Sequence, residues 1–194
     1  MARTARFDVR DIARIATFAA LIAVLGLPGT IPVFGGAVPI TAQTLGVMLA
    51  GAILGPWRGA AAVIVLEILV LIGLPLLSGG RGGPGAFVSP SAGFLLGWIL
   101  GAFLVGLIVR ADRGPSWTRT ILGTIIGGIL AIYAVGIPVQ AAVMGLGLGE
   151  TALLSAAFLP GDLIKAALTT AIVMTLHRAY PRAFRTHTRV ATAA

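Results

Sequence analysis

Six apolar segments, separated by shorter stretches rich in glycine, proline or charge, run along this chain. The segments cover residues of about 12–27, 40–56, 58–74, 91–110, 118–141 and 160–178. A helix that crosses the hydrocarbon core of a bilayer needs about 20 apolar residues, within a range of roughly 17–25. The pattern therefore predicts an all-α integral membrane protein with six transmembrane helices. No linker is long enough to separate two units, so residues 1–194 are expected to form a single domain.

Composition indicates the same class of protein. Hydrophobic residues make up 58% of the chain, charged residues make up 10%, and the mean hydropathy is +1.03. Soluble domains carry about 25% charged residues, so this chain cannot cover a water-facing surface and is expected to contact membrane lipid. The chain has no cysteine, which excludes disulfides, thiolate catalysis and cysteine-based metal sites. The first segment follows arginines as a signal peptide does, but no A-x-A site follows it, so a retained helix is expected.

The basic residues predict the orientation in the membrane. Twelve of the 14 fall on one side of the six segments, at the N-terminus, in the second and fourth loops and at the C-terminus. Because basic loops stay inside, both termini and these loops are expected to be cytoplasmic. Only Arg81 and Lys165 fall on the outer side. The basic residues are scattered singly and lack aromatic partners. Membrane topology therefore explains their positions better than binding to nucleic acid does.

The three outer loops are longer and richer in glycine than the inner ones. The first, "PGTIPVFGGAVP" (28–39), has a hairpin signal around Gly35-Gly36 that its prolines weaken. The third, "PLLSGGRGGPGAFVSP" (75–90), places five glycines around Arg81. The fifth (142–162) is apolar enough for a short interfacial helix. Each loop alone is explained equally well as a flexible turn. Together, on the face with both outer cations, they favour a binding face.

The stretch "FLPGDLIKAAL" (158–168) carries a carboxylate and the chain's only lysine at the head of an apolar segment. Pro160 suits the first turn of a helix, where Asp162 either caps backbone N–H groups or contacts a ligand. Lys165 either snorkels to the interface or pairs with Asp162 at i,i+3. Alternatively, Lys165 and the helix N-terminus, with Arg81 nearby, form an anion site. Ionisable groups within spans default to a functional hypothesis, which favours ligand contact for Lys165.

Several other polar residues lie in or beside the apolar segments. Gln43 and Thr44, at the outer end of the second segment, hydrogen-bond either a ligand or a neighbouring helix. Glu67 lies within the third segment and is either protonated and hydrogen-bonded or part of the cavity lining. Tyr133 and Ser89 are further ligand candidates.

Small residues recur at helical spacing in two segments. Gly93, Gly97 and Gly101 repeat at i+4, and Ala16, Ala20 and Ala23 lie along one flank of the first helix. Such faces permit close helix contact. Because Lys165 follows Ile164, the chain has no G-x-x-x-x-G-K-[ST] pattern for binding ATP. It also lacks the paired aspartates of an intramembrane aspartyl protease. The chain is therefore not expected to be an enzyme, and no cofactor or metal is expected.

Three stretches are similar, in order and spacing, to the hallmark segments of a transport family. They are "VPITAQTLGVMLAGAILGPWRGA" (38–60), "GLPLLSGGRGGPGAFVSPSAGFLLGW" (73–98) and "FLPGDLIKAAL" (158–168). Over nearly its whole length the chain resembles the BioY family, the biotin-specific S components of energy-coupling factor (ECF) transporters. The resemblance implies a six-helix protein of the prokaryotic plasma membrane that captures biotin from outside, in a pocket closed by the first and third loops. It also implies a transmembrane T component and two ABC-type ATPases as partners.

The resemblance also assigns roles to residues of this chain. It implies that Asp162 and Lys165 belong to the binding region, with Arg81 as the polar member of the third loop. The alanine face of Ala16, Ala20 and Ala23 resembles the surface that meets the T component. Glu67 is atypical for its helix. High-affinity biotin binding is therefore the expected function. An S component for another small vitamin and a ligand-free membrane scaffold are the alternatives.

Overall fold

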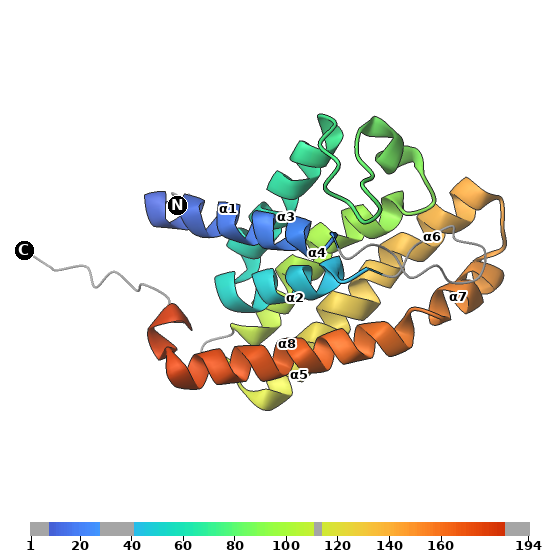
Figure 1. The fold of residues 1–194 in the computed structure, drawn as a ribbon. Helices are drawn as coiled ribbons and strands as arrows, with labels where there is room; N and C mark the ends of the chain where they lie inside the picture. Colours follow the sequence, from blue (N-terminus) through green and yellow to red (C-terminus); the bar gives the residue numbers. More distant parts are fainter. Residues whose placement is uncertain (1–7, 28–40, 111–113, 185–194) are drawn as a thin grey trace, which may run out of the picture.

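The computed structural model describes residues 8–27, 41–110 and 114–184, which contain six main helical stretches. Their arrangement is drawn in Figure 1. These are α1 (Val9–Val24), α2 (Gln43–Leu54), α3 (Pro56–Leu71), α4 (Ala92–Val109), a continuous stretch of α5 (Trp117–Ile125), the π-helix η2 (Ile126–Ala131) and α6 (Ile132–Met144), and α8 (Leu159–Ala179). Shorter elements are η1 (Pro84–Val88), α7 (Leu148–Ala156) and η3 (Pro181–Phe184). The all-α prediction is confirmed for the described residues, and each predicted apolar segment overlaps one stretch, with ends that differ by up to three residues. The hairpin predicted at 28–39 lies outside them.

Three of the helical stretches are long and apolar enough to cross a membrane. They are Ala92–Val109, Trp117–Met144 and Leu159–Ala179. The other three are shorter, with 16 residues in α1, 12 in α2 and 16 in α3. The short helix expected within 142–162 is present as α7. The chain is thus a helical protein with several membrane-capable helices.

Local sequence accounts for where several helices begin and end. Asp8 and Asp11 form a capping box at the start of α1, and the Ser116 hydroxyl accepts the Arg119 N–H at the start of α5. Gly55, with φ of +88°, is the single residue between α2 and α3, and Pro56 begins α3. A positive φ suits glycine, and proline suits a first helical turn, so the chain reverses direction there within one residue.

Helix α4 lies at the centre of the bundle and packs against α2, α3, α5, η2 and α6. Its glycine face meets the π-helix and α6. A Cβ at Gly97 would lie 2.9 Å from the Ile132 carbonyl oxygen, and one at Gly101 would lie 2.9 Å from that of Gly127. Any larger side chain would separate the backbones. The close helix contact expected from the Gly93-Gly97-Gly101 repeat is therefore confirmed.

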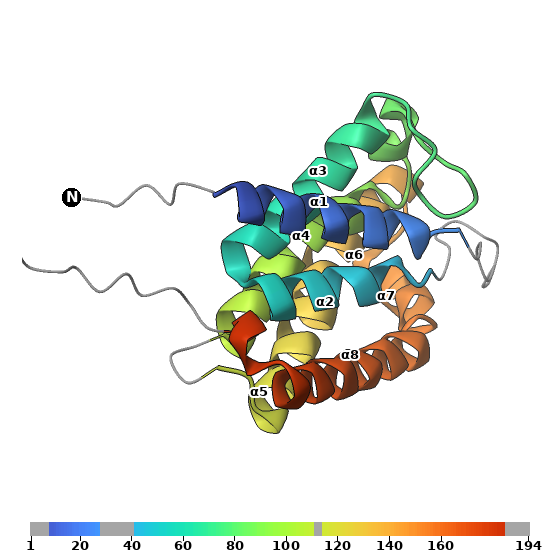
Figure 2. The same ribbon diagram turned by 60° about the vertical axis from the view of Figure 1, so that its left-hand side comes forward.

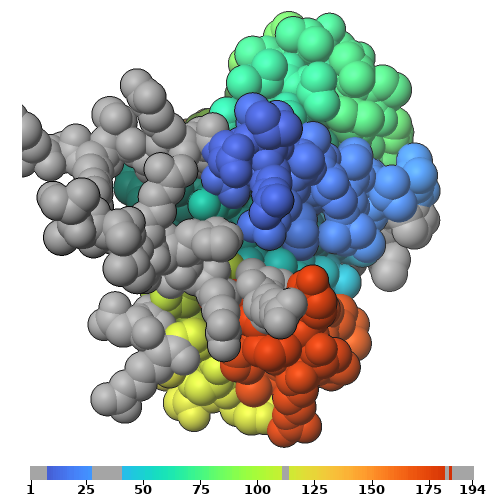
Figure 3. All heavy atoms as spheres, turned by 90° about the vertical axis from the view of Figure 1, so that its left-hand side faces the viewer, coloured from blue at the N-terminus to red at the C-terminus, as the bar shows by residue number. Residues whose placement is uncertain are grey.

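The helix ends gather at two opposite ends of the molecule. At the first, Arg110 after α4 donates to the backbone oxygens of Ile53 in α2 and Phe184 in η3, and Arg58 of α3 pairs with Asp11 of α1 at 2.8 Å. We call it the arginine end. Figure 3 views the molecule from this side, with α1 in blue and the last turns of α8 in orange-red.

The opposite end carries the start of α2, the finish of α1 and α3, and the start of α8. Gln43 at the start of α2 hydrogen-bonds Ile22 near the end of α1. The six stretches therefore alternate in direction. Helices α1 and α8 lie on either side of α2 (Figures 1 and 2).

Candidate substrate-binding cavity

A cavity of about 610 Å³, part of it open to solvent, lies between α2, α4, η2, α6, α8 and the loop that precedes α4. Its apolar wall includes Leu77, Phe94, Leu95, Trp98, Ile132 and Phe158. Its polar wall includes Thr44, Arg81, Ser91, Tyr133, Asp162 and Lys165. Sites for small molecules combine an apolar wall with a few placed polar groups, as this cavity does.

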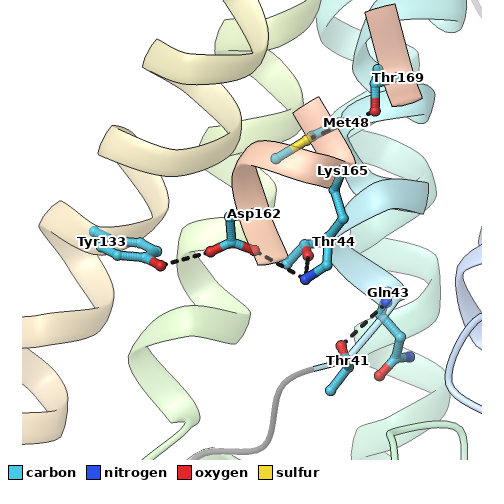
Figure 4. A network of polar contacts seen from close by, with 8 residues as sticks. All are labelled: Thr41, Gln43, Thr44, Met48, Tyr133, Asp162, Lys165 and Thr169. Carbon is cyan, nitrogen blue, oxygen red and sulfur yellow. Dashed lines mark hydrogen bonds and ion pairs between the residues drawn. The ribbon is translucent and has the colours of Figure 1, made fainter. Parts of the chain in front are cut away.

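Asp162 and Lys165 form the centre of the polar wall (Figure 4). The Lys165 ammonium lies 3.0 Å from the Asp162 carboxylate and donates to the Thr44 hydroxyl at 2.8 Å. The Tyr133 hydroxyl donates to the other carboxylate oxygen of Asp162 at 2.6 Å. Four side chains from α2, α6 and α8 are thus joined in one network. Charge-assisted hydrogen bonds of this kind are short and strong, so the network holds its members in place.

The network decides between the alternatives that the sequence left open for α8. Among the described residues, no side chain forms a capping hydrogen bond at the start of α8, so capping by Asp162 is wrong. The Lys165 side chain is only 12% exposed, so Lys165 does not snorkel to the surface. It pairs with Asp162 and also lines the cavity. The pairing offsets part of the cost of burying two charges, and the cavity gives a ligand access to them.

Arg81 supplies a second cation to the cavity, from the loop between α3 and α4. Its Nη1 donates to the Ser91 hydroxyl at 3.1 Å, and its Nε donates to the Ser78 carbonyl at 3.4 Å. Desolvation by burial lowers the pKa of the guanidinium. Ser89, a sequence candidate, is not part of the cavity wall. Its hydroxyl donates to the Ala86 carbonyl at 2.7 Å and lies 2.9 Å from that of Ser91.

Gln43 borders the cavity but its amide is used within the protein. The side-chain nitrogen donates to the carbonyls of Ile22 at 3.2 Å and Leu76 at 3.0 Å. The side-chain oxygen accepts the Ser78 N–H at 3.1 Å. Figure 4 shows the Gln43 amide pointing away from the Lys165 ammonium. Of the two alternatives for Gln43, the structure therefore supports hydrogen bonds to neighbouring segments of the protein.

Glu67 lies in α3 outside the cavity wall, so the lining alternative for this residue is wrong. It is buried, and its Oε1 makes no hydrogen bond to the described part of the chain.

The aromatic part of the wall was not predicted from sequence. The Phe94 ring packs edge-on against two other rings. Its centroid lies 6.0 Å from that of Tyr133 and 6.3 Å from that of Phe158. Trp98 lies one turn beyond Phe94 on α4 and lines the same cavity. These residues sit in segments that are apolar on every side, so no pattern distinguished a cavity face from a lipid face. Gly128 of the π-helix η2 also lines the cavity, and π-helical segments are frequent at functional sites.

Comparison with known proteins places the chain in a family. The model of the BioY family matches residues 1–182. The chain belongs to the BioY family. A biotin transporter BioY from Rhodobacter capsulatus is 48% identical over 185 residues, covering 90% of this chain and 96% of that protein. One from Rhizobium etli is 48% identical over 180 residues, with the same coverage.

A solved structure extends the BioY likeness to the fold. It is the crystal structure of an S component for biotin from an ECF-type ABC transporter, with a TM-score of 0.85 and 32% sequence identity. The match covers 95% of this chain and 100% of that chain. Both the sequence resemblance and the helical S-component fold expected from it are confirmed.

Proposed function

We propose that this chain binds biotin with high affinity as the S component of an ECF-type uptake transporter. One observation carries the proposal. In this BioY-family chain, the side chains of Arg81, Lys165 and Asp162 line a cavity whose remaining wall is largely apolar. A ligand for such a site has an anionic group, hydrogen-bonding groups and an apolar body.

Biotin has these properties. Its carboxylate suits the Arg81 guanidinium or the Lys165 ammonium, because charge-assisted bonds to carboxylates are strong. Its ureido ring offers two N–H donors and a carbonyl, which suit the Asp162 carboxylate and hydroxyl groups such as that of Tyr133. Its thioether ring and aliphatic chain suit the wall around Phe94 and Trp98.

Transport by this chain depends on partners in the proposed assembly, a T component in the membrane and two ABC-type ATPases. The surface proposed to meet the T component is the alanine flank of α1. Ala16 and Ala20 are exposed and Ala23 is half-buried. Small side chains allow a partner's backbone to approach closely. Exposure of two of these alanines supports the flank as a contact surface.

The six helical stretches each cross the prokaryotic plasma membrane in this proposal, with both termini and the arginine end in the cytoplasm. The alternating direction of the six helical stretches supports six crossings. Exposed aromatic residues support a membrane–water boundary at the arginine end, since Trp and Tyr are enriched at such boundaries. Trp57 lies in the first turn of α3, Trp117 begins α5 and Tyr180 follows α8, and they are 67%, 49% and 59% exposed.

Titration calorimetry of the purified chain in detergent tests the function. Biotin, its methyl ester, thiamine and riboflavin are titrated separately. We expect saturable binding of biotin, weaker binding of the ester because its carboxylate charge is lost, and no binding of the other vitamins. Preference for another vitamin would favour an S component of different specificity. Absence of binding to all four in a folded sample would favour a membrane scaffold.

A further inference from the structure

We infer that Gln43 is a positioning residue. It holds the loop between α3 and α4 (residues 72–91, the Arg81 loop) in its binding geometry and ties that loop to the end of α1. The inference rests on the proposed biotin site and adds a residue that acts on the ligand through Arg81.

The first step is the placement of the Gln43 amide between three segments. It belongs to α2, donates to Ile22 in α1 and to Leu76 after α3, and accepts from Ser78 in the same loop. Gln43 is 1% exposed. A buried amide that loses its partners costs about the full desolvation penalty of its polar atoms, so the three segments are strongly held together.

The second step leads from Ser78 to Arg81. The Leu77 N–H donates to the Arg81 carbonyl at 3.0 Å, and the Arg81 N–H donates back to the Leu77 carbonyl at 3.2 Å. The Arg81 side chain also donates to the Ser78 carbonyl. Residues 77–81 therefore form one closed turn. Because Gln43 fixes Ser78 within this turn, it fixes the backbone from which the guanidinium reaches the cavity.

The third step leads to α1. The Ser78 hydroxyl donates to the Gly26 carbonyl at 3.3 Å, just beyond the end of α1. Helices α1 and α2 are close here, since a Cβ at Gly46 would lie 2.9 Å from Cγ1 of Ile22. The Arg81 loop is thus bonded to the helix whose alanine flank we propose as the T-component surface. A shift of α1 at this end therefore acts on the loop through Gln43 and Ser78.

A direct bond from the Gln43 amide to biotin is the competing explanation. Both of its N–H groups already have protein acceptors, so a ligand carbonyl would have to displace Ile22 or Leu76. The two explanations differ in one measurable respect. A positioning residue loses its effect on affinity when Arg81 is removed, whereas a direct contact keeps it.

A double-mutant cycle measures this difference. Biotin affinity is determined by calorimetry for the native chain, Gln43→Met, Arg81→Ala and the double variant. We expect Gln43→Met to weaken binding about five- to twentyfold, and to weaken it no further in the Arg81→Ala background, because coupled residues are not additive. Additive losses, or an unchanged affinity for Gln43→Met, would overturn the inference.

The matched control is Gln140→Met. Gln140 is likewise a buried glutamine, 2% exposed, and its Oε1 accepts from Ser155 of α7 at 3.2 Å away from the cavity wall. We expect it to lower thermal stability as Gln43→Met does and to leave biotin affinity unchanged. An equal loss of affinity would show a general packing effect and overturn the inference.

If Gln43→Met does not fold, Gln43→Asn replaces it, since the asparagine amide is one methylene too short to reach the same partners. Failure of the native chain to bind biotin would instead contradict the proposed function.

Discussion

The Lys165 ammonium donates to the Thr44 hydroxyl at 2.8 Å and thereby joins two residues that are 121 positions apart. This bond lies where α8 passes α2, at the wall of the cavity. An ammonium has three donors, and within the described part of the chain two of them are directed at Thr44 and Asp162. Lys165 is therefore held in place by protein and has donor capacity for a ligand.

Replacing Lys165 tests its contact with biotin. We expect Lys165→Ala to weaken binding by about 1.5–3 kcal/mol, the scale of a charge-assisted hydrogen bond. This equals roughly a tenfold to more than hundredfold rise in the dissociation constant, measured by calorimetry. Arg178→Ala, which removes a cation from the exposed end of α8, is the control and should leave the constant unchanged. Native affinity in a folded Lys165→Ala variant would limit the lysine to its pair with Asp162.

Bulky substitutions on the alanine flank of α1 are predicted to disrupt contact with the T component without affecting biotin binding. Ala16→Trp with Ala20→Trp should spare biotin affinity but abolish co-purification with a T component and the uptake that depends on it, because bulky side chains keep another helix away. The control is Ile164→Trp with Leu168→Trp, on the exposed apolar face of α8, at 62% and 47% exposure. Retained co-purification in the α1 variant would exclude this flank as the contact surface.

Cysteine labelling tests the proposed orientation on a chain that has no cysteine of its own. Gly85→Cys, in the Arg81 loop, should react in intact cells with an impermeant thiol reagent, and Thr118→Cys, at the arginine end, should react only after permeabilisation. Both positions are exposed, and a side chain at Gly85 meets no other atom within 4 Å. Gly82 is unsuitable because a Cβ there would overlap the Leu74 carbonyl oxygen. The reverse labelling pattern would place the cavity on the cytoplasmic side.

Replacing the buried carboxyl of Glu67 with an apolar side chain is predicted to stabilise the protein. A buried carboxyl with an oxygen that lacks a partner costs about 1–3 kcal/mol, so Glu67→Leu should raise the melting temperature by roughly 2–10 °C for a chain of this length. Glu67→Gln keeps the shape and the polarity and should show little of this gain. Since Glu67 lies outside the cavity wall, biotin affinity should be native in both variants. A lower melting temperature for Glu67→Leu would mean that the carboxyl has a stabilising partner.

Local sequence is enough to predict the helical class, the approximate positions of the six helical stretches and the pair of ionisable residues at the head of α8. These properties are local: length, hydropathy, caps and glycine-proline breaks act within a few residues of where they occur. The Asp162–Lys165 pair is of this kind, because residues three apart on a helix are neighbours. The match of the BioY family model to residues 1–182 is likewise a property of the sequence alone.

The set of polar groups that share the cavity depends on contacts between segments that are far apart in the sequence. Thr44 lies beside Lys165, Ser91 rather than Ser89 contacts Arg81, and Gln43 bonds α1 and the loop. A membrane helix is apolar on its lipid face as well as its inner face, so periodicity does not reveal its rotation. That rotation is set by contacts between distant segments, such as the close approach of Gly97 to Ile132.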